Sequence, residues 1–176
     1  MACALTTSLQ LNCRDSVGGL KEIKIHAHPG LTEVGDAYSV SSGVVTIAAQ
    51  GGNRLDWYTW SLEKETCSFD ENITTNVPNG TTFYQQELKV IFNKFSTKLR
   101  NEIAIYAQTP VQLAVRDMND NYWLIGMDYG ADLTAGKHSS GTARGDRSGT
   151  ELTFMAKESQ SILNMSAATY NLLVTV

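Results

Sequence analysis

Residues 115–159 read VRDMNDNYWLIGMDYGADLTAGKHSSGTARGDRSGTELTFMAKES, a series of short apolar runs separated by clusters of Gly, Asp, Asn and Ser. Residues 111–117 and 122–127 are apolar runs that flank a polar Met-Asn-Asp-Asn turn, which predicts a β-hairpin. Residues 131–136 and 149–158 have the composition of two further strands. This stretch therefore predicts an antiparallel array of short strands with glycine-rich turns.

The chain before this stretch continues the β pattern. In residues 20–27, Ile23, Ile25 and Ala27 alternate with polar side chains, which is typical of a half-buried strand. Residues 37–52 are β-rich, with a glycine at position 43 that fits a hairpin turn or bulge. Residues 61–92 form the longest β region, with Pro78-Asn79-Gly80 near their centre. This sequence predicts a turn, because Pro fixes φ and Asn-Gly tolerates positive φ. We therefore expect a long hairpin or loop around residues 61–92.

One segment changes period. Leu99, Ile103 and Tyr106 are spaced i, i+4, i+7, which places them on one face of a helix. Ser96 is a suitable N-cap, and Pro110 follows where a helix has to have ended. The tail, residues 169–176, is rich in β-branched and aromatic residues and is interpreted as a last strand.

Together these patterns predict a mainly β fold, a β-sandwich or barrel of about eight strands with one short packed α-helix. No composition shift or linker divides the chain, so residues 1–176 are expected to form a single domain.

Composition and charge limit the possible functions. The net charge is −4 and no long basic run occurs, so the electrostatic pattern of a dedicated nucleic-acid binder is missing. The three cysteines, Cys3, Cys13 and Cys67, fit no zinc spacing and are interpreted as reduced thiols of a protein made in the cytoplasm. The first residues lack the features of a signal peptide, and no apolar run is long enough for a membrane helix, so we expect no membrane contact.

Chemical motifs in the chain have simpler structural explanations. Residues 117–128 carry oxygens at calcium-loop spacing but lack the glycine that such a loop needs, which favours a hairpin turn. Arg144-Gly145-Asp146 lies in a turn sequence that leads into a strand. His26 and His28 share a strand face but have no third ligand nearby in the sequence. Catalytic motifs are absent, so we expect no enzyme activity, no metal and no cofactor.

The aromatic group Trp57, Tyr58 and Trp60 leaves two interpretations open. Such residues could stack on a carbohydrate, but alternation along a strand separates Trp57 from the other two. Aromatic residues are also enriched at protein interfaces, so a place in the core or between subunits is favoured. The alternative function is therefore a β-sandwich module that binds carbohydrate or a cell surface, and a sugar binder would expose these side chains.

Two segments carry a resemblance to a known family: VQLAVRDMNDNYWLIGMDYGADLTAG (111–136) and SSGTARGDRSGTELTFMAKES (139–159), with Cys13 and VGGLKEIKI (17–25) as a looser N-terminal match. They resemble structural tail proteins of tailed bacteriophages, in particular the small proteins that form rings or tubes in phages and prophages of the Bacteroidetes. The resemblance does not separate a tail-tube subunit from a subunit of a head-to-tail connector ring.

The resemblance implies a structural virion protein, made in the bacterial host cytoplasm and located in the tail or connector. Its subunits would close into a homo-oligomeric ring, six-fold or twelve-fold, next to other tail or connector proteins. The ring would form part of a conduit through which DNA passes without specific binding, and the −4 net charge agrees with an acidic lumen.

An assembling protein can use exposed strand edges that other proteins have to block. The long hairpin region has no chemistry of its own, so its tip, residues 72–82, is expected to pack on an adjacent subunit or ring. The residues predicted at subunit contacts are Trp57, Tyr58, Trp60, Asn76, Pro78, Asn79 and Phe83.

Overall fold

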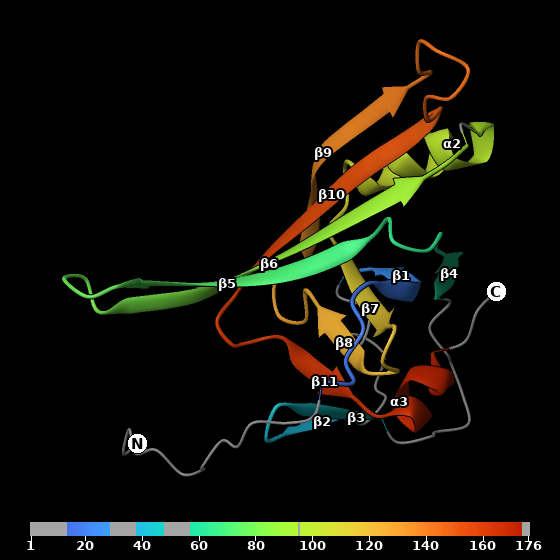
Figure 1. The fold of residues 1–176 in the computed structure, drawn as a ribbon. Coiled ribbons are helices and arrows are strands. Elements are labelled where there is room, and N and C mark those ends of the chain that lie inside the picture. Colours follow the sequence, from blue (N-terminus) through green and yellow to red (C-terminus); the bar gives the residue numbers. More distant parts are fainter. Residues whose placement is uncertain (1–13, 29–37, 48–56, 95, 174–176) are drawn as a thin grey trace.

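The computed structural model describes residues 14–28, 38–47, 57–94 and 96–173. These residues form a mainly β fold with eleven strands and two helices (Figure 1). The strands are β1 (Leu20–Ala27), β2 (Tyr38–Ser41), β3 (Val44–Ile47), β4 (Tyr58–Ser61), β5 (Ser68–Asn76), β6 (Thr81–Phe92), β7 (Val111–Asp117), β8 (Tyr122–Ile125), β9 (Ala131–Ser139), β10 (Gly149–Glu158) and β11 (Leu163–Met165); the helices are α2 (Thr97–Tyr106) and α3 (Ala167–Leu172).

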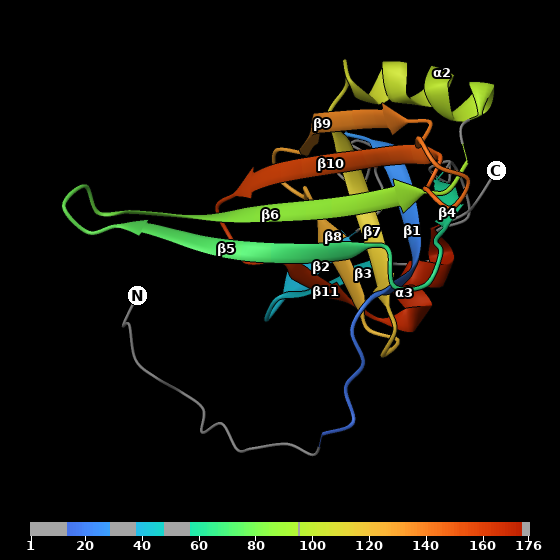
Figure 2. The same cartoon turned by 45° about the horizontal axis from the view of Figure 1, so that its top comes forward.

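The strands form one strongly bent sheet that does not close into a barrel. Its order is β2-β3-β11-β8-β7-β9-β10-β6-β5, and β1 pairs with both β7 and β4. The bend lies between β7 and β9, which pair only at Val111 and Ala131. The upper part is the antiparallel array β9-β10-β6-β5, and the lower part holds the remaining strands (Figures 1 and 2).

The main core lies between the two parts of the sheet. The upper part contributes Leu88 and Phe154, and the lower part contributes Ile23, Ile25 and Leu113, all of them fully buried. Burial of such side chains is the dominant favourable term in folding. The alternation in β1 predicted Ile23, Ile25 and Ala27 on the inner face; the first two are fully buried, whereas Ala27 at the strand end is exposed.

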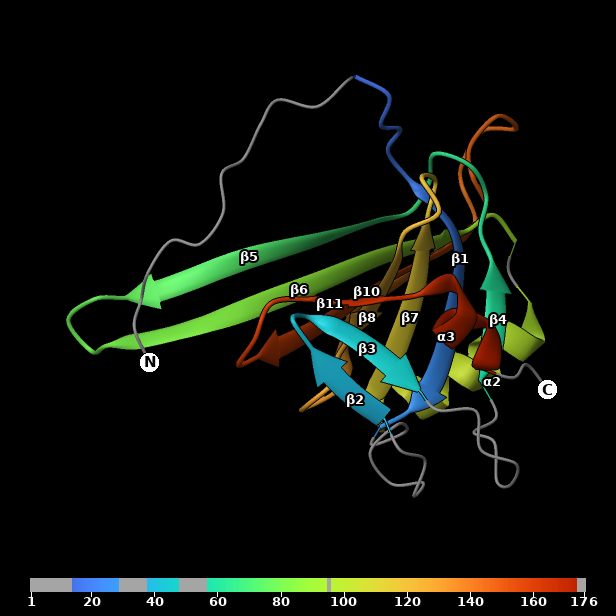
Figure 3. The ribbon, with the colours of Figure 1, turned by 90° about the horizontal axis from the view of Figure 1, so that it is seen from below.

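A second core lies on the other face of the lower part, beneath α3. It contains Trp57, Ala114, Leu124 and Tyr170. Strand β7 is therefore covered on both faces, which explains why VQLAV is a continuous apolar run rather than an alternating one. Figure 3 shows α3 in front of β1 on this side, where Lys24 of β1 donates a hydrogen bond to Tyr170 O.

The structure confirms the predicted mainly β fold with a packed helix, with more strands than the eight or so expected. Helix α2 begins as predicted: the Ser96 side chain accepts a hydrogen bond from Leu99 N. The interpretation of residues 169–176 as a strand is wrong for residues 169–173, because Ala167–Leu172 is helical with Ser166 as its N-cap, and residues 174–176 lie outside the described residues. Burial of Tyr170 against β1 outweighs the weak strand propensity of this segment.

Candidate functional site

The β5–β6 hairpin extends beyond the body of the protein (Figure 2). Its strands pair from Ser68–Lys89 to Asn76–Thr81, whereas β10 covers β6 only as far as Tyr84. Residues 72–83, called the hairpin tip below, therefore have little besides each other to contact within the described chain. A two-stranded ribbon of this kind is marginally stable by itself in water.

The turn at the end of the hairpin tip is well defined by hydrogen bonds. Gly80 N donates to Val77 O at 3.2 Å, and Asn79 N donates to the Asn76 side-chain oxygen at 3.2 Å. Gly80 has a positive φ of 63°, which the Asn-Gly sequence predicted. A turn fixed in this way loses less conformational entropy when it binds than a flexible loop does.

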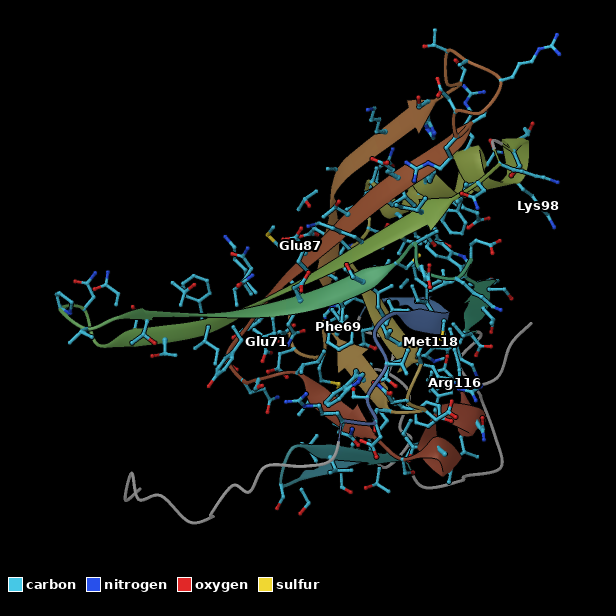
Figure 4. The ribbon with its side chains drawn as sticks, in the orientation of Figure 1. Phe69, Glu71, Glu87, Lys98, Arg116 and Met118 are labelled. Carbon is cyan, nitrogen blue, oxygen red and sulfur yellow. The ribbon has the colours of Figure 1, made fainter. Side chains whose placement is uncertain are left out.

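The base of the hairpin is anchored to the lower part of the sheet. Phe69 packs against Trp123 with ring centroids 6.0 Å apart. The Glu71 carboxylate accepts hydrogen bonds from Ile162 N at 2.6 Å and from the Ser161 hydroxyl at 2.7 Å. Figure 4 shows Phe69 and Glu71 on the side of β5 that faces β8 and β11, with Glu87 on the opposite side. The hairpin tip is therefore held on a fixed base.

The hairpin tip exposes two large apolar side chains. Val77 is 82% exposed and Ile73 is 64% exposed. Residues 72–83 contain no charged side chain, although charges are the usual protection of exposed strands. The tip thus lacks the charges that keep an exposed strand pair from contacting other chains.

The upper part of the sheet also has two open edges. Strand β5 pairs only with β6, and β9 pairs with β10 and, at Ala131 alone, with β7. Within the part of the chain that the structure describes, the outer edges of β5 and of β9 beyond Ala131 have no strand partner. Each is a nine-residue strand, long enough to pair with another chain.

The structure separates the aromatic candidates from those on the hairpin. Trp57 is fully buried in the second core, 5.6 Å from the His26 ring, so it offers no surface to a neighbour. Tyr58 is half exposed on β4. Trp60 packs edge-on against Phe92 and Tyr106, at centroid distances of 5.2 and 5.5 Å. The remaining candidates lie at the far end of β6 from these aromatics: Asn76, Pro78, Asn79 and Phe83.

Trp60 forms part of a cleft of about 920 Å³ between β4, the C-terminal end of β6 and helix α2, called the α2 cleft below. Tyr106 donates a hydrogen bond to Glu102 at 3.1 Å, and burial raises the pKa of its phenol. The aromatic and apolar residues of the cleft include Tyr58, Trp60, Ile91, Phe92, Leu99 and Tyr106, and its charged residues are Glu63, Lys94, Lys98 and Glu102. The sequence pattern did not predict this cleft, because its walls come from three separate elements.

The other polar motifs act within turns. The Asp117 carboxylate accepts hydrogen bonds from Asn119 N and Asn121 N, both at 2.8 Å. These bonds close the turn between β7 and β8, at the start of the stretch with calcium-loop spacing. Asp146 accepts from Thr142 N and Ala143 N, and these bonds lower its pKa. Among the described residues, no group of three or more His, Cys, Asp or Glu side chains is arranged to bind a metal.

Asn119 has a further role that its position in a turn did not reveal. Its side-chain amide accepts a hydrogen bond from Val17 N and donates one to Val17 O, both at 2.8 Å. The amide thus pairs with the backbone as a neighbouring strand would. This contact fixes the N-terminal segment just before β1 to the β7–β8 turn.

Glu158 is a buried carboxylate at the end of β10. It accepts hydrogen bonds from Asp128 N at 3.1 Å and Tyr129 N at 3.2 Å, and so holds the loop between β8 and β9. Burial raises its pKa more than these two bonds lower it, and the nearby Asp128 charge raises it further. The native state therefore binds a proton here at a pH where the unfolded chain has released it.

We expect Glu158→Gln to change how stability depends on pH. As pH rises from the unfolded pKa of about 4.3 through the higher folded pKa, the unfolded chain loses its proton first, so the free energy of unfolding falls. Urea unfolding at a series of pH values measures this fall in the wild type. The slope should be smaller in Glu158→Gln, and equal slopes in the two proteins would contradict the assignment.

Comparisons with known proteins return no family: no family model, curated protein or solved structure matches this chain. No helix among the described residues is long and apolar enough to cross a membrane.

Proposed function

We propose that this protein is a structural subunit that assembles with its own copies into a ring of a tailed-bacteriophage virion, in the tail or the head-tail connector. The observation that carries the proposal is the pair of open edges on the β9-β10-β6-β5 array. The resemblance of residues 111–136 and 139–159 to phage tail proteins supports the same function. The protein would act by assembly alone, without a reaction.

The topology of the array suits head-to-tail pairing. Four strands alternate in direction, so β5 and β9 run in opposite directions at the two outer edges (Figure 2). A second copy placed beside the first brings its β9 antiparallel to β5, and the sheet continues across the contact. Such a contact uses two different surfaces of each copy, and it forms a closed ring when the rotation between copies divides a full turn.

The proposed ring encloses a passage for DNA, with neighbouring tail or connector proteins above and below. A net charge of −4 per chain means that the ring as a whole repels the nucleic-acid backbone. The carbohydrate-binding alternative required the aromatic group at residues 57–60 to be exposed as a platform. Trp57 is buried in the second core, whereas Tyr58 and Trp60 line the α2 cleft. Residues 57–60 therefore do not form one exposed platform, which favours the assembly proposal.

Light scattering and negative-stain imaging of the purified protein at high concentration test the proposal. We expect closed rings with a molar mass that is a whole multiple of the 19.3 kDa chain, and their images give the symmetry. A protein that stays monomeric at all concentrations would contradict self-assembly.

Proline substitutions at two successive positions of β9 test the edge itself. Successive N–H groups of a strand point to opposite edges. Of the two variants Gly136→Pro and Lys137→Pro, one therefore loses an N–H that bonds to β10, and the other loses an N–H at the open edge of β9. The variant that affects the β10 side should lose about 3 kcal/mol of stability. The other should melt close to the wild type yet form no rings, and rings from that stable variant would show that this edge is not the contact.

A further inference from the structure

The hairpin tip and the α2 cleft lie at opposite ends of the same strand, β6. We propose that the hairpin tip of one copy seats in the α2 cleft of the next copy along the strand direction, with Val77 as the apolar anchor. This inference rests on the proposed assembly and adds a second contact to it. The edges of β5 and β9 join copies side by side, whereas this contact joins them end to end.

The geometry excludes contact between the tip and the cleft of a single chain. β6 begins at the turn with Thr81 and ends in the cleft with Phe92, and its twelve residues span roughly 40 Å at about 3.3 Å per residue. The tip therefore needs a cleft from another copy. Pairing of β5 with β9 adds copies across the strand direction, so a contact along the strands joins one ring to the next.

The two surfaces match in polarity. The tip presents Val77 and Ile73, and the cleft offers Trp60, Leu99 and Tyr106. Burial of large apolar groups against aromatic side chains is typical of the centre of a protein interface.

The two surfaces also match in charge. The four charged residues of the cleft are two lysines and two glutamates, so their formal charges cancel, and the tip has none. The tip therefore adds no charge to the cleft, and the contact brings no like charges together. The hydrogen-bonded turn at Val77 to Gly80 is already ordered before it docks.

Photo-crosslinking identifies the surface that the tip contacts. Benzoylphenylalanine replaces Val77 in the full chain, and the assembled protein is irradiated, digested and analysed by mass spectrometry. We expect products between copies that map to residues 58–63 or 91–106. Products that map to another surface, or no product between copies under conditions where stacks are seen, would overturn the inference.

A charge at the anchor tests the consequence for assembly. Val77→Asp should reduce the fraction of stacked rings at least about tenfold, because the carboxylate has to be desolvated in an aromatic cleft. Val40→Asp is the matched control, since Val40 is 40% exposed on β2, outside both proposed contacts. Unchanged stacking of Val77→Asp would overturn the inference.

The same images separate this inference from the proposed function. Rings that form without stacks in Val77→Asp support both proposals. Wild-type rings whose stacking does not depend on Val77 leave the ring proposal in place and overturn the tip contact. Open chains of copies that crosslink from the tip to the cleft, without any closed ring, contradict the ring and support the tip contact.

Discussion

Replacing Gly126 with alanine is expected to lower the free energy of unfolding by about 3–5 kcal/mol. Gly126 follows β8 and has a φ of +71°, which strains any residue with a Cβ atom. A Cβ here would also lie 2.7 Å from Ala131 N and 3.0 Å from Val111 O. Both atoms belong to the backbone, so no side-chain rotation relieves the contact.

The position of Gly126 makes this effect large. Val111 and Ala131 form the pair that joins β7 to β9 at the bend between the two parts of the sheet. Gly126 N also donates a hydrogen bond to the buried Gln86 side chain at 3.2 Å, which ties β6 to the same point. An added methyl group therefore disturbs the junction that sets the position of the hairpin relative to the lower part of the sheet.

Urea unfolding followed by tryptophan fluorescence measures the change. Gly145→Ala is the control, because an added Cβ there meets no atom within 4 Å, and its effect should stay within about 0.5 kcal/mol. A Gly126→Ala protein within about 1 kcal/mol of the wild type would mean that the bend can relax, contrary to the geometry.

Local patterns in the sequence predicted the local structure well. The Pro-Asn-Gly turn defined the β5–β6 hairpin, and the Ser96 cap with the spacing of Leu99, Ile103 and Tyr106 defined α2. These signals act over a few residues, where backbone preference and side-chain period suffice. The same turn signal placed the end of the hairpin between β5 and β6, where the structure has it.

The second core was not predictable in this way. Alternation indicated that Glu22, Lys24 and His26 face solvent, whereas Lys24 is 7% exposed beneath α3. The sequence predicted a strand where helix α3 covers Lys24, so the cover over this face was not foreseen. Contacts between residues almost 150 positions apart decide this face, and no local period records them.

The same limit applies to the candidate site. Alternation separated Trp57 from Trp60, and the two belong to different cores on opposite faces of the sheet. That Trp57 is fully buried while Trp60 lines a cleft does not follow from residues 57–60 alone. The anchoring role of Glu71 depends on residues 161 and 162, ninety positions away. The α2 cleft likewise needs three elements to be placed together before it exists.

Lys24→Ala is expected to lower the free energy of unfolding by about 2–4 kcal/mol. The Lys24 ammonium donates hydrogen bonds to Leu173 O at 2.8 Å and Tyr170 O at 3.1 Å, at the C-terminal end of α3. It also lies 4.5 Å from the centroid of the Tyr170 ring. Burial lowers the pKa of this amine, and the Glu22 charge partly opposes that effect.

The cost of the substitution comes from the groups that remain. Two carbonyl oxygens at a helix end lose a charged donor, and cations at this end of a helix are favoured by its dipole. Lys21→Ala is the control, since Lys21 forms an exposed ion pair with Asp120 and should contribute at most about 1 kcal/mol.

Lys24→Met separates the charge from the packing of the aliphatic stem. Methionine fills a similar volume but donates no hydrogen bond, so Lys24→Met should remain at least about 2 kcal/mol less stable than the wild type. Near-ultraviolet circular dichroism should report a changed environment of Tyr170 in the same variant. If Lys24→Met is as stable as the wild type, the stem alone holds α3 in place, and the hydrogen bonds to its carbonyls add nothing to the stability of the fold.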